Sequence, residues 1–194
     1  MNQSVIAHCK GYVAQLVRVL EQQEWNEVET LAQTIFRSWE KGQNLFLCGN
    51  GGSAGNAIHL ANDFLYGVGK DLVPGIKVEA LSANASVLTC LANDIGYEEI
   101  FSQQLKVKAA PGDVLVVLSG SGNSRNVVRA LEVGSEIGME TFAILGYSGG
   151  RCLDLAKVSI HFPVNDMQIS EDMQMVVGHM CMQWLYQQRQ DQFQ

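Results

Sequence analysis

The chain has 194 residues, of which 47% are hydrophobic and 17% are charged, and its formal net charge at pH 7 is -7. This length and composition predict a folded domain with a substantial core and exclude a disordered chain. The acidic balance, without any run of lysine or arginine, argues against nucleic-acid binding. No apolar stretch approaches the length of a membrane span, so we expect neither nucleic acid nor membrane as a partner.

The cysteine usage predicts a reducing environment. The five cysteines are Cys9, Cys48, Cys90, Cys152 and Cys181. They are scattered, never form a C-x-x-C pair, and in several cases lie in apolar runs, which is typical of reduced core thiols. The start of the chain has no basic segment followed by an apolar core, as a secretion signal would have. We therefore expect a cytoplasmic protein.

Two amphipathic helices are predicted at the amino end, over residues 3–21 and 27–41. Their apolar residues recur at steps of three and four, so each helix has one apolar face. Together they form a helical extension, residues 1–42, whose apolar surface we expect to pack against another subunit. The whole chain, residues 1–194, is then one domain with this extension.

From residue 44 onward, short apolar strands alternate with helices. The strands are predicted at 44–48, 76–81, 114–118, 141–145 and 157–162, and the helices at 54–67, 83–93, 97–108, 124–137 and 170–189. Nearly all-apolar strands separated by helices indicate a parallel sheet that is covered on both faces. The expected fold is therefore α/β, a doubly wound three-layer sandwich with a five-stranded parallel sheet, plus the N-terminal helices and a C-terminal helix.

Two loops rich in glycine and serine each follow an apolar strand and open into a helix. The first has the sequence GNGGS over residues 49–53, and the second has SGSGNS over residues 119–124. Ligands of doubly wound sheets lie beyond the carboxyl ends of the strands, so both loops can face one pocket. Main-chain amides and serine hydroxyls at two helix N-termini hold a phosphate without lysine or arginine. Neither loop is a Walker A motif or a G-x-G-x-x-G motif, which makes a nucleotide ligand a weak interpretation.

A second set of polar residues suits acid–base or metal chemistry. His59 and Asp63 are four residues apart on the helix after the first loop and share a face. The last helix carries Glu171, Asp172 and His179. On an ideal helix Asp172 aligns with His179 within about 20°, whereas Glu171 differs by about 80°. Two histidines and two carboxylates make a reasonable zinc shell and equally a reasonable acid–base pair, although each pattern alone also fits a structural hydrogen bond.

Together these motifs resemble the sugar isomerase (SIS) domain, and within it the sedoheptulose 7-phosphate (phosphoheptose) isomerase family. The resemblance rests on the GNGGS loop with His59, on Asn93 and Asp94, and on the SGSGNS loop, and it covers nearly the whole chain. It implies an SIS fold and an aldose–ketose isomerase that converts sedoheptulose 7-phosphate to D-glycero-D-manno-heptose 7-phosphate through an enediol, for the heptose of surface lipopolysaccharide. It also implies a homotetramer with its sites at subunit interfaces.

The resemblance further implies that His59, Asp63, Glu171 and His179 surround one zinc ion per subunit. Asp63 and His179 are the expected acid–base catalysts. Typical family members have Glu at the position of Asp63 and Gln at that of Glu171. Asp is one methylene shorter than Glu, and the extra charge of Glu171 favours a metal but repels an anionic intermediate. Alignment with the family favours Glu171 over Asp172 as the site residue.

The substrate-binding set follows from the loops and the resemblance. We expect the loops to hold the phosphate, and Asn50, Asn93 and Asp94 to hydrogen-bond sugar hydroxyls. The full predicted set is Asn50, Gly51, Gly52, Ser53, Asp63, Asn93, Asp94, Ser119, Gly120, Ser121, Ser124 and Glu171.

Three alternatives remain at this stage. Serine loops recognise phosphate and not chain length, so the substrate can be another phosphosugar. Relatives of this fold also act as non-catalytic adaptors of the bacterial replication initiator protein, although an adaptor would not need His59, Asp63 and His179. A sugar-phosphate sensing domain of a regulator lacks support, because no DNA-binding domain fits in the remaining residues.

Overall fold

The computed structural model describes residues 4–70 and 72–192, and these residues form a five-stranded sheet in the order β2-β1-β3-β4-β5. All neighbouring strands are parallel. The strands are β1 (Asn44–Gly49), β2 (Lys77–Ala80), β3 (Val114–Ser119), β4 (Glu140–Leu145) and β5 (Val158–His161). After β1 the chain builds to one side with β2 and then crosses to the other side with β3, which confirms the predicted doubly wound fold and puts the topological switch point between β1 and β3.

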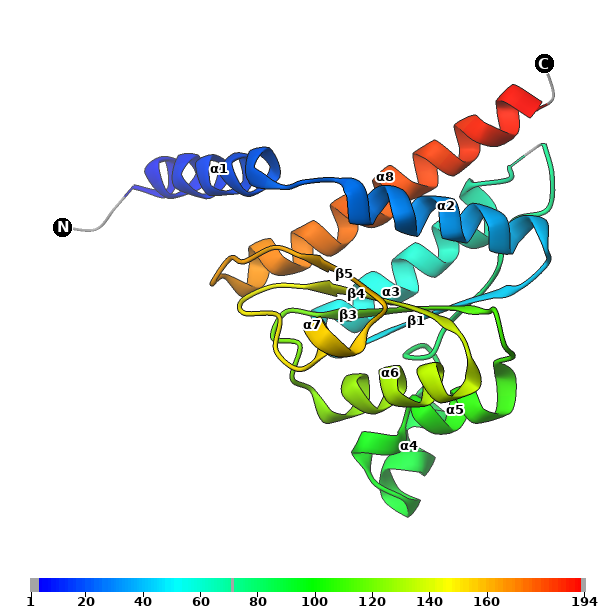
Figure 1. Ribbon diagram of the computed structural model, residues 1–194. Coiled ribbons are helices and arrows are strands. Elements are labelled where there is room, and N and C mark those ends of the chain that lie inside the picture. The colour runs from blue at the N-terminus through cyan, green and yellow to red at the C-terminus, as the bar shows by residue number, and fades with distance from the viewer. Residues whose placement is uncertain (1–3, 71, 193–194) are drawn as a thin grey trace.

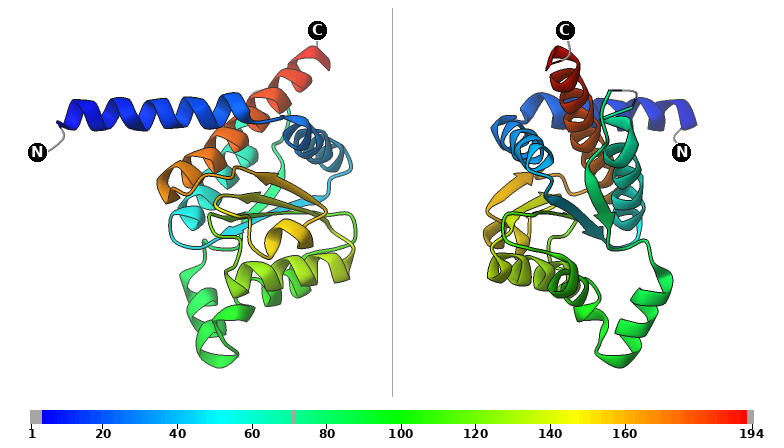
Figure 2. Two further views of the ribbon diagram at one scale, coloured as in Figure 1. Left: turned by 60° about the vertical axis from the view of Figure 1, so that its left-hand side comes forward. Right: turned by 90° about the vertical axis from the view of Figure 1, so that its right-hand side faces the viewer.

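Helices cover both faces of this sheet (Figure 1). They are α1 (Val5–Gln22), α2 (Asn26–Glu40), α3 (Gly52–Asn62), α4 (Ala85–Asp94), α5 (Ser102–Lys108), α6 (Arg125–Ile137), α7 (Cys152–Leu155) and α8 (Met167–Gln192). The helices α2, α3 and α8 lie on one face, and α5, α6 and α7 lie on the other. Figure 2 shows α1 extending from the body of the molecule and α4 protruding at the opposite end. Among the described residues, no helix combines the length and apolarity needed to cross a bilayer.

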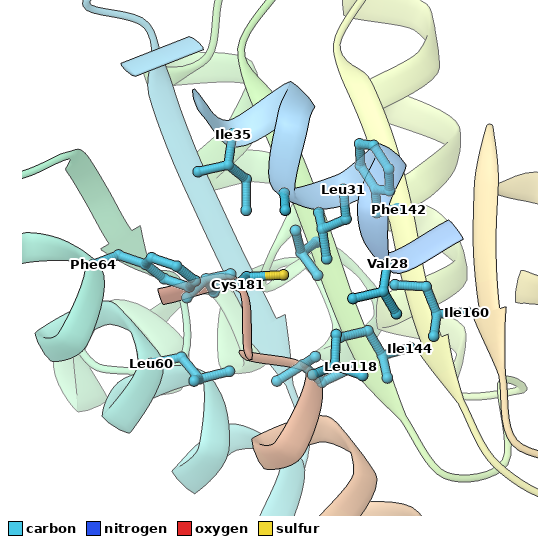
Figure 3. Packing of buried hydrophobic residues seen from close by; sticks show 14 of the residues in the cluster. Val28, Leu31, Ile35, Leu60, Phe64, Leu118, Phe142, Ile144, Ile160 and Cys181 are labelled. Atoms are coloured by element: carbon cyan, nitrogen blue, oxygen red, sulfur yellow. The ribbon is translucent and has the colours of Figure 1, made fainter. Parts of the chain in front are cut away.

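The side chains of the strands divide alternately between two cores, as the period of a strand requires. In β1, Leu45 and Leu47 join the core under α2, α3 and α8, whereas Phe46 and Cys48 join the core under α5 and α6. Figure 3 shows part of the first core, where side chains of α2, α3 and α8 meet those of the sheet. Burial on both faces explains why the strands are almost entirely apolar.

The two N-terminal helices differ in their burial. The α2 side chains Val28, Leu31 and Ile35 are buried in the first core, so this helix is a layer of the sandwich within a single chain. None of the residues of α1 is buried, and its contact with the core is made by partly buried side chains such as Tyr12 and Leu16. The extension therefore consists of a buried layer, α2, and an exposed helix, α1.

Two of the predicted helices differ from the observed elements, and one observed helix was not predicted. The predicted helix over 97–108 consists of a 3-10 turn (Tyr97–Glu99) followed by α5. The predicted helix over 54–67 is α3 up to Asn62 and then a π-helical turn, Asp63–Gly67. The helix α7 was not predicted, because four residues are too few to show a helical period.

A glycine allows α3 and α8 to approach each other closely. A Cβ atom on Gly178 of α8 would overlap the side chain of Leu60 of α3. Small residues at a crossing let two helix backbones come together, as in close helix packing generally. Because His59 and His179 are the immediate neighbours of Leu60 and Gly178, this contact also sets the distance between the two imidazoles.

Candidate active site

The carboxyl ends of β1 and β3 open into one cavity of about 290 Å³, at the switch point of the sheet. Both glycine-serine loops line this cavity, as expected, and α8 closes it with Met167 and Glu171. The lining residues are Asn50, Gly51, Gly52, Ser53, Leu118, Ser119, Gly120, Ser121, Ser124, Met167 and Glu171. We refer to this space as the loop cavity.

Both loops direct helix N-termini at the loop cavity. In the first loop, Gly51 has φ +55 and stands immediately before α3, a conformation that favours glycine. In the second loop, Ser124 precedes α6 and its hydroxyl makes no capping bond to that helix. The unpaired amides of two first helical turns and the Ser124 hydroxyl are therefore available to an anionic ligand.

A pair of side-chain amides joins the first loop to the start of α6, which follows the second loop. The side chains of Asn50 and Asn126 exchange two hydrogen bonds of 2.9 and 2.8 Å, and Tyr97 donates a third to Asn50 at 2.8 Å. Asn126, on α6, is 1% exposed. These bonds occupy the amide that we expected to hold sugar hydroxyls, and they fix the spacing of the loops. Asn126 was not predicted as a site residue, because its one visible signal is a polar residue before two valines on a buried face.

Polar contacts also join α3 to α8 beside the cavity. Gln174 donates to the hydroxyl of Ser53 at 3.0 Å, and Asn56 donates both to Gln174 and to the backbone carbonyl of Glu171 at 3.0 Å. Ser53 is 4% exposed, so its hydroxyl accepts one structural bond and keeps its proton for a ligand in the cavity. Asn56 and Gln174 were not predicted as site residues.

Three of the four predicted metal ligands come together. The Nε2 atoms of His59 and His179 are 3.2 Å apart, and each lies 3.4 Å from Oδ2 of Asp63. A tetrahedral zinc site with bonds of about 2.0–2.1 Å places its ligand atoms about 3.3–3.4 Å apart, so this donor set fits a zinc ion and leaves one position open. Asp63 begins the π-helical turn, a distortion that is frequent at functional sites.

The fourth predicted ligand, Glu171, is not part of this group in the structure. Its carboxylate lies against Gly52, where a Cβ atom would overlap it, and it lines the loop cavity. The difference follows from the helix geometry, since residues 171 and 179 point about 80° apart on α8. A carboxylate at the first turn of α3 is also stabilised by the N-terminal helix dipole.

The neighbouring carboxylate, Asp172, points out of the site. It accepts a short hydrogen bond from Tyr12 of α1. This bond to the carboxylate raises the pKa of Tyr12 to about 12, with burial as a smaller cause. The structure therefore selects Glu171 over Asp172 as the acidic residue of α8 that faces the loop cavity.

Asn93 and Asp94 do not line the loop cavity. Both are exposed on α4, where Asn93 donates to Asp94 at 2.8 Å and the thiol of Cys90 also points at Asp94. Their role toward a sugar stays a prediction. The segment that follows α4 does reach the site, because Tyr97 bonds to Asn50.

The loop cavity and the His59–Asp63–His179 cluster lie along the same two helices. From Gly52 to His59 the rise of α3 is about 10 Å, and from Glu171 to His179 the rise of α8 is about 12 Å. An extended seven-carbon sugar phosphate spans roughly 10 Å from phosphorus to its first carbon with ordinary single-bond lengths. The arrangement can therefore hold an anion at one end and perform acid–base or metal chemistry at the other.

Comparisons with known proteins identify the family of the chain. Residues 10–146 match the model of the SIS domain family. A phosphoheptose isomerase of Akkermansia muciniphila is 39% identical over 154 residues, which is 79% of this chain and 81% of that protein. One from Aliarcobacter butzleri is 32% identical over 92% of this chain and 94% of that protein. The solved phosphoheptose isomerase of Neisseria gonorrhoeae superimposes with a TM-score of 0.85 at 26% identity, covering 94% of this chain and 98% of that one.

Proposed function

The chain belongs to the SIS domain family and, within it, to the phosphoheptose isomerases, and on this basis we propose that it interconverts sedoheptulose 7-phosphate and D-glycero-D-manno-heptose 7-phosphate. The observation that carries the proposal is the His59–Asp63–His179 cluster, about 10 Å along α3 from a cavity formed by two helix N-termini. That separation suits a substrate whose phosphate and reacting carbons are at opposite ends of a seven-carbon chain.

In the proposed complex the phosphate occupies the loop cavity. Ser119, Ser121 and Ser124 provide hydroxyls, and the first turns of α3 and α6 provide amides. Glu171 lies at the α3 end of the same cavity, where it accepts hydrogen bonds from sugar hydroxyls and disfavours a phosphate next to it. The phosphate is therefore expected at the SGSGNS loop, with the sugar chain passing Glu171 towards the two imidazoles.

The isomerisation moves a proton between C1 and C2 through an enediol. One group must remove the proton from carbon, and another must exchange protons with the two oxygens. Asp63 and His179 fit these roles, because the Asp63 side chain is 18% exposed and its Oδ2 is 3.4 Å from the His179 imidazole. Asp is one methylene shorter than Glu, and Oδ2 of Asp63 lies 3.4 Å from both imidazoles.

Zinc is proposed as the cofactor on the fit of the donor atoms. His59, Asp63 and His179 would hold it, with the predicted fourth ligand Glu171 directed elsewhere in the single chain. When bound, the ion would polarise the carbonyl oxygen and stabilise the negative charge that develops on the enediol.

We also propose that the chain acts as a homotetramer with its sites at subunit interfaces. The support is α1, which exposes Val5, Ile6, Val13 and Val17, and an apolar groove between α2 and α8 lined by Trp25, Val28 and Trp184. Exposed apolar surface of this extent typically marks an interface. A cytoplasmic location remains part of the proposal and is supported by five free thiols, three of them buried.

The test is an assay with purified protein and sedoheptulose 7-phosphate, following formation of the aldose. We expect turnover that a chelator suppresses and added zinc restores. A panel of five-, six- and seven-carbon ketose phosphates separates this substrate from another phosphosugar. Absence of turnover with and without zinc rejects the isomerase. Capture of a replication initiator protein by an inactive protein would favour the adaptor, which the matched isomerases and the intact cluster do not favour.

A further inference from the structure

A second polar cavity lies at the amino ends of the strands, opposite the carboxyl ends where the loop cavity lies. It has a volume of about 280 Å³ and lies where β1, β3 and β4 begin, next to the end of α2. Its lining residues are Thr34, Arg37, Ser38, Lys41, Gln43, Gly112 and Glu140. We call it the basal cavity. Because the two cavities are at opposite ends of the strands, both can be filled at once.

The basal cavity contains hydrogen-bond donors without partners. Ser38 is 5% exposed, and in the part of the chain that the structure describes its hydroxyl makes no hydrogen bond. The side-chain amide of Gln43, which lies over Gly112, likewise has no partner there. Both groups open onto the cavity, so they are free to donate hydrogen bonds to a molecule bound in it.

The charge around these donors is positive. Arg37 and Lys41 form no ion pair with a carboxylate among residues 4–70 and 72–192, although Arg37 donates to the hydroxyl of Thr34 at 2.9 Å. The amine of Lys77 lies nearby, 3.7 Å from the position of a Cβ atom on Gly42. Glu140 is the acidic residue of the lining, and Lys157 pairs with it at 3.0 Å. Unpaired cations therefore gather at one place in a chain whose net charge is -7.

The helix dipole explains part of this pattern. Arg37 is in the last turn of α2, where cations are stabilised by the partial negative charge of the helix end. That effect requires neither a cavity nor the unpaired donors of Ser38 and Gln43. Two cations, a hydroxyl and a primary amide around one space match the donors that recognise a phosphate group.

We propose that the basal cavity binds a small multivalent anion of the phosphate or phosphate-ester class. Arg37 and Lys41 supply the charge, and Ser38 and Gln43 donate hydrogen bonds to the anion. This site is separate from the proposed isomerase site and does not depend on it.

The test is calorimetric titration with inorganic phosphate at constant ionic strength. The background is a Ser121→Ala/Ser124→Ala variant, which weakens phosphate binding in the loop cavity. We expect one remaining phosphate per chain, and at least about tenfold weaker binding after Arg37→Gln/Lys41→Gln. Lys10→Gln/Arg18→Gln removes two exposed cations of α1 and should leave the affinity unchanged.

Ser38→Ala removes the hydroxyl that faces the cavity without changing the charge and should weaken binding by several fold. If the Arg37→Gln/Lys41→Gln variant does not fold, Ser38→Ala alone tests whether phosphate binds in the basal cavity. The proposal is overturned if no phosphate binds in the Ser121→Ala/Ser124→Ala background. It is also overturned if the Ser38 and Arg37/Lys41 variants bind phosphate as tightly as that background protein does. Neither result bears on isomerase activity, which is measured separately.

Discussion

At the scale of single residues, two adjacent carboxylates on α8 have different surroundings. Glu171 lies against Gly52 in the loop cavity, whereas Asp172 accepts a hydrogen bond from Tyr12 outside it. Helix geometry alone aligned Asp172 with His179. The hydrogen bond from Tyr12 of α1, which is distant in the sequence, directs Asp172 away from the loop cavity.

Glu171→Gln removes a negative charge from the cavity that is proposed to take the phosphate. Loss of that repulsion, worth about 1 kcal/mol near a protein surface, should lower KM for the sugar phosphate by roughly fivefold. Asp172→Asn is the matched control and should change KM little, because Asp172 points at Tyr12. Steady-state kinetics of both variants decide the point. An equal effect of the two substitutions would contradict the assignment.

Asn126→Ala removes both hydrogen bonds to the half-buried amide of Asn50, which keeps only the bond from Tyr97. We expect the free energy of unfolding to fall by roughly 1–3 kcal/mol, which is the usual net cost of losing two hydrogen bonds. KM should rise as well, because the two loops lose their fixed spacing. Urea unfolding and kinetics measure the two effects. The exposed Asn26→Ala should stay within about 0.5 kcal/mol of wild type, and a similar result for Asn126 would show that the amide pair does not hold the loops.

At the scale of elements, the crossing of α3 and α8 brings together the candidate metal ligands His59, Asp63 and His179. Each helix provides one histidine, and Asp63 begins the π-helical turn that follows α3. The close approach at Gly178 and Leu60 lies one residue from both imidazoles. The cluster therefore depends on helix packing as much as on its own side chains.

Gly178→Ala should push α3 and α8 apart. We expect a loss of roughly 1–3 kcal/mol in unfolding free energy from overpacking, together with weaker zinc binding. Gly55→Ala, at an open position on α3, is the control and should stabilise the helix by roughly 0.5–1 kcal/mol. Chemical denaturation and zinc titration report on both. If Gly178→Ala is as stable as Gly55→Ala and binds zinc normally, the crossing does not set the cluster.

The elements differ in how far the sequence predicts them. The five strands are buried on both faces, so their apolar runs mark them clearly, and each observed strand lies within about one residue of its prediction. The two loops and the pair His59 and Asp63 are also local patterns, so composition and spacing within a few residues were enough to predict them. The bonds from Asn126 to Asn50 and from Gln174 to Ser53 join residues 76 and 121 positions apart, which no local period can show.

At the scale of the whole molecule, a single chain leaves apolar surface and part of the site open. No residue of α1 is buried, and the His59 side chain is 52% exposed. A catalytic site that excludes water generally needs more cover than this. Assembly of several chains, with α1 at the contact, would bury the apolar surface of α1. The same assembly is proposed to cover the exposed site at His59.

Val13→Asp/Val17→Asp places two charges in the exposed apolar stripe of α1 and should reduce the assembly to smaller species. Ala14→Asp/Arg18→Asp adds at least as much negative charge about 80–120° around the same helix from the two valines and should leave the assembly intact. Light scattering after gel filtration gives the mass of each. Equal masses for the two variants would exclude α1 from the contact.

The central claim is that Asp63 and His179 transfer protons to and from the substrate. Isomerisation in deuterated water tests this claim most directly. Proton NMR of sedoheptulose 7-phosphate incubated with the wild-type protein should show the aldose forming with solvent deuterium at C2. In His179→Ala, conversion should fall by roughly 10²–10⁴-fold while the protein stays folded, and the exposed control His8→Ala should behave as wild type. Conversion without deuterium in the product, at an unchanged rate in His179→Ala, would contradict the account.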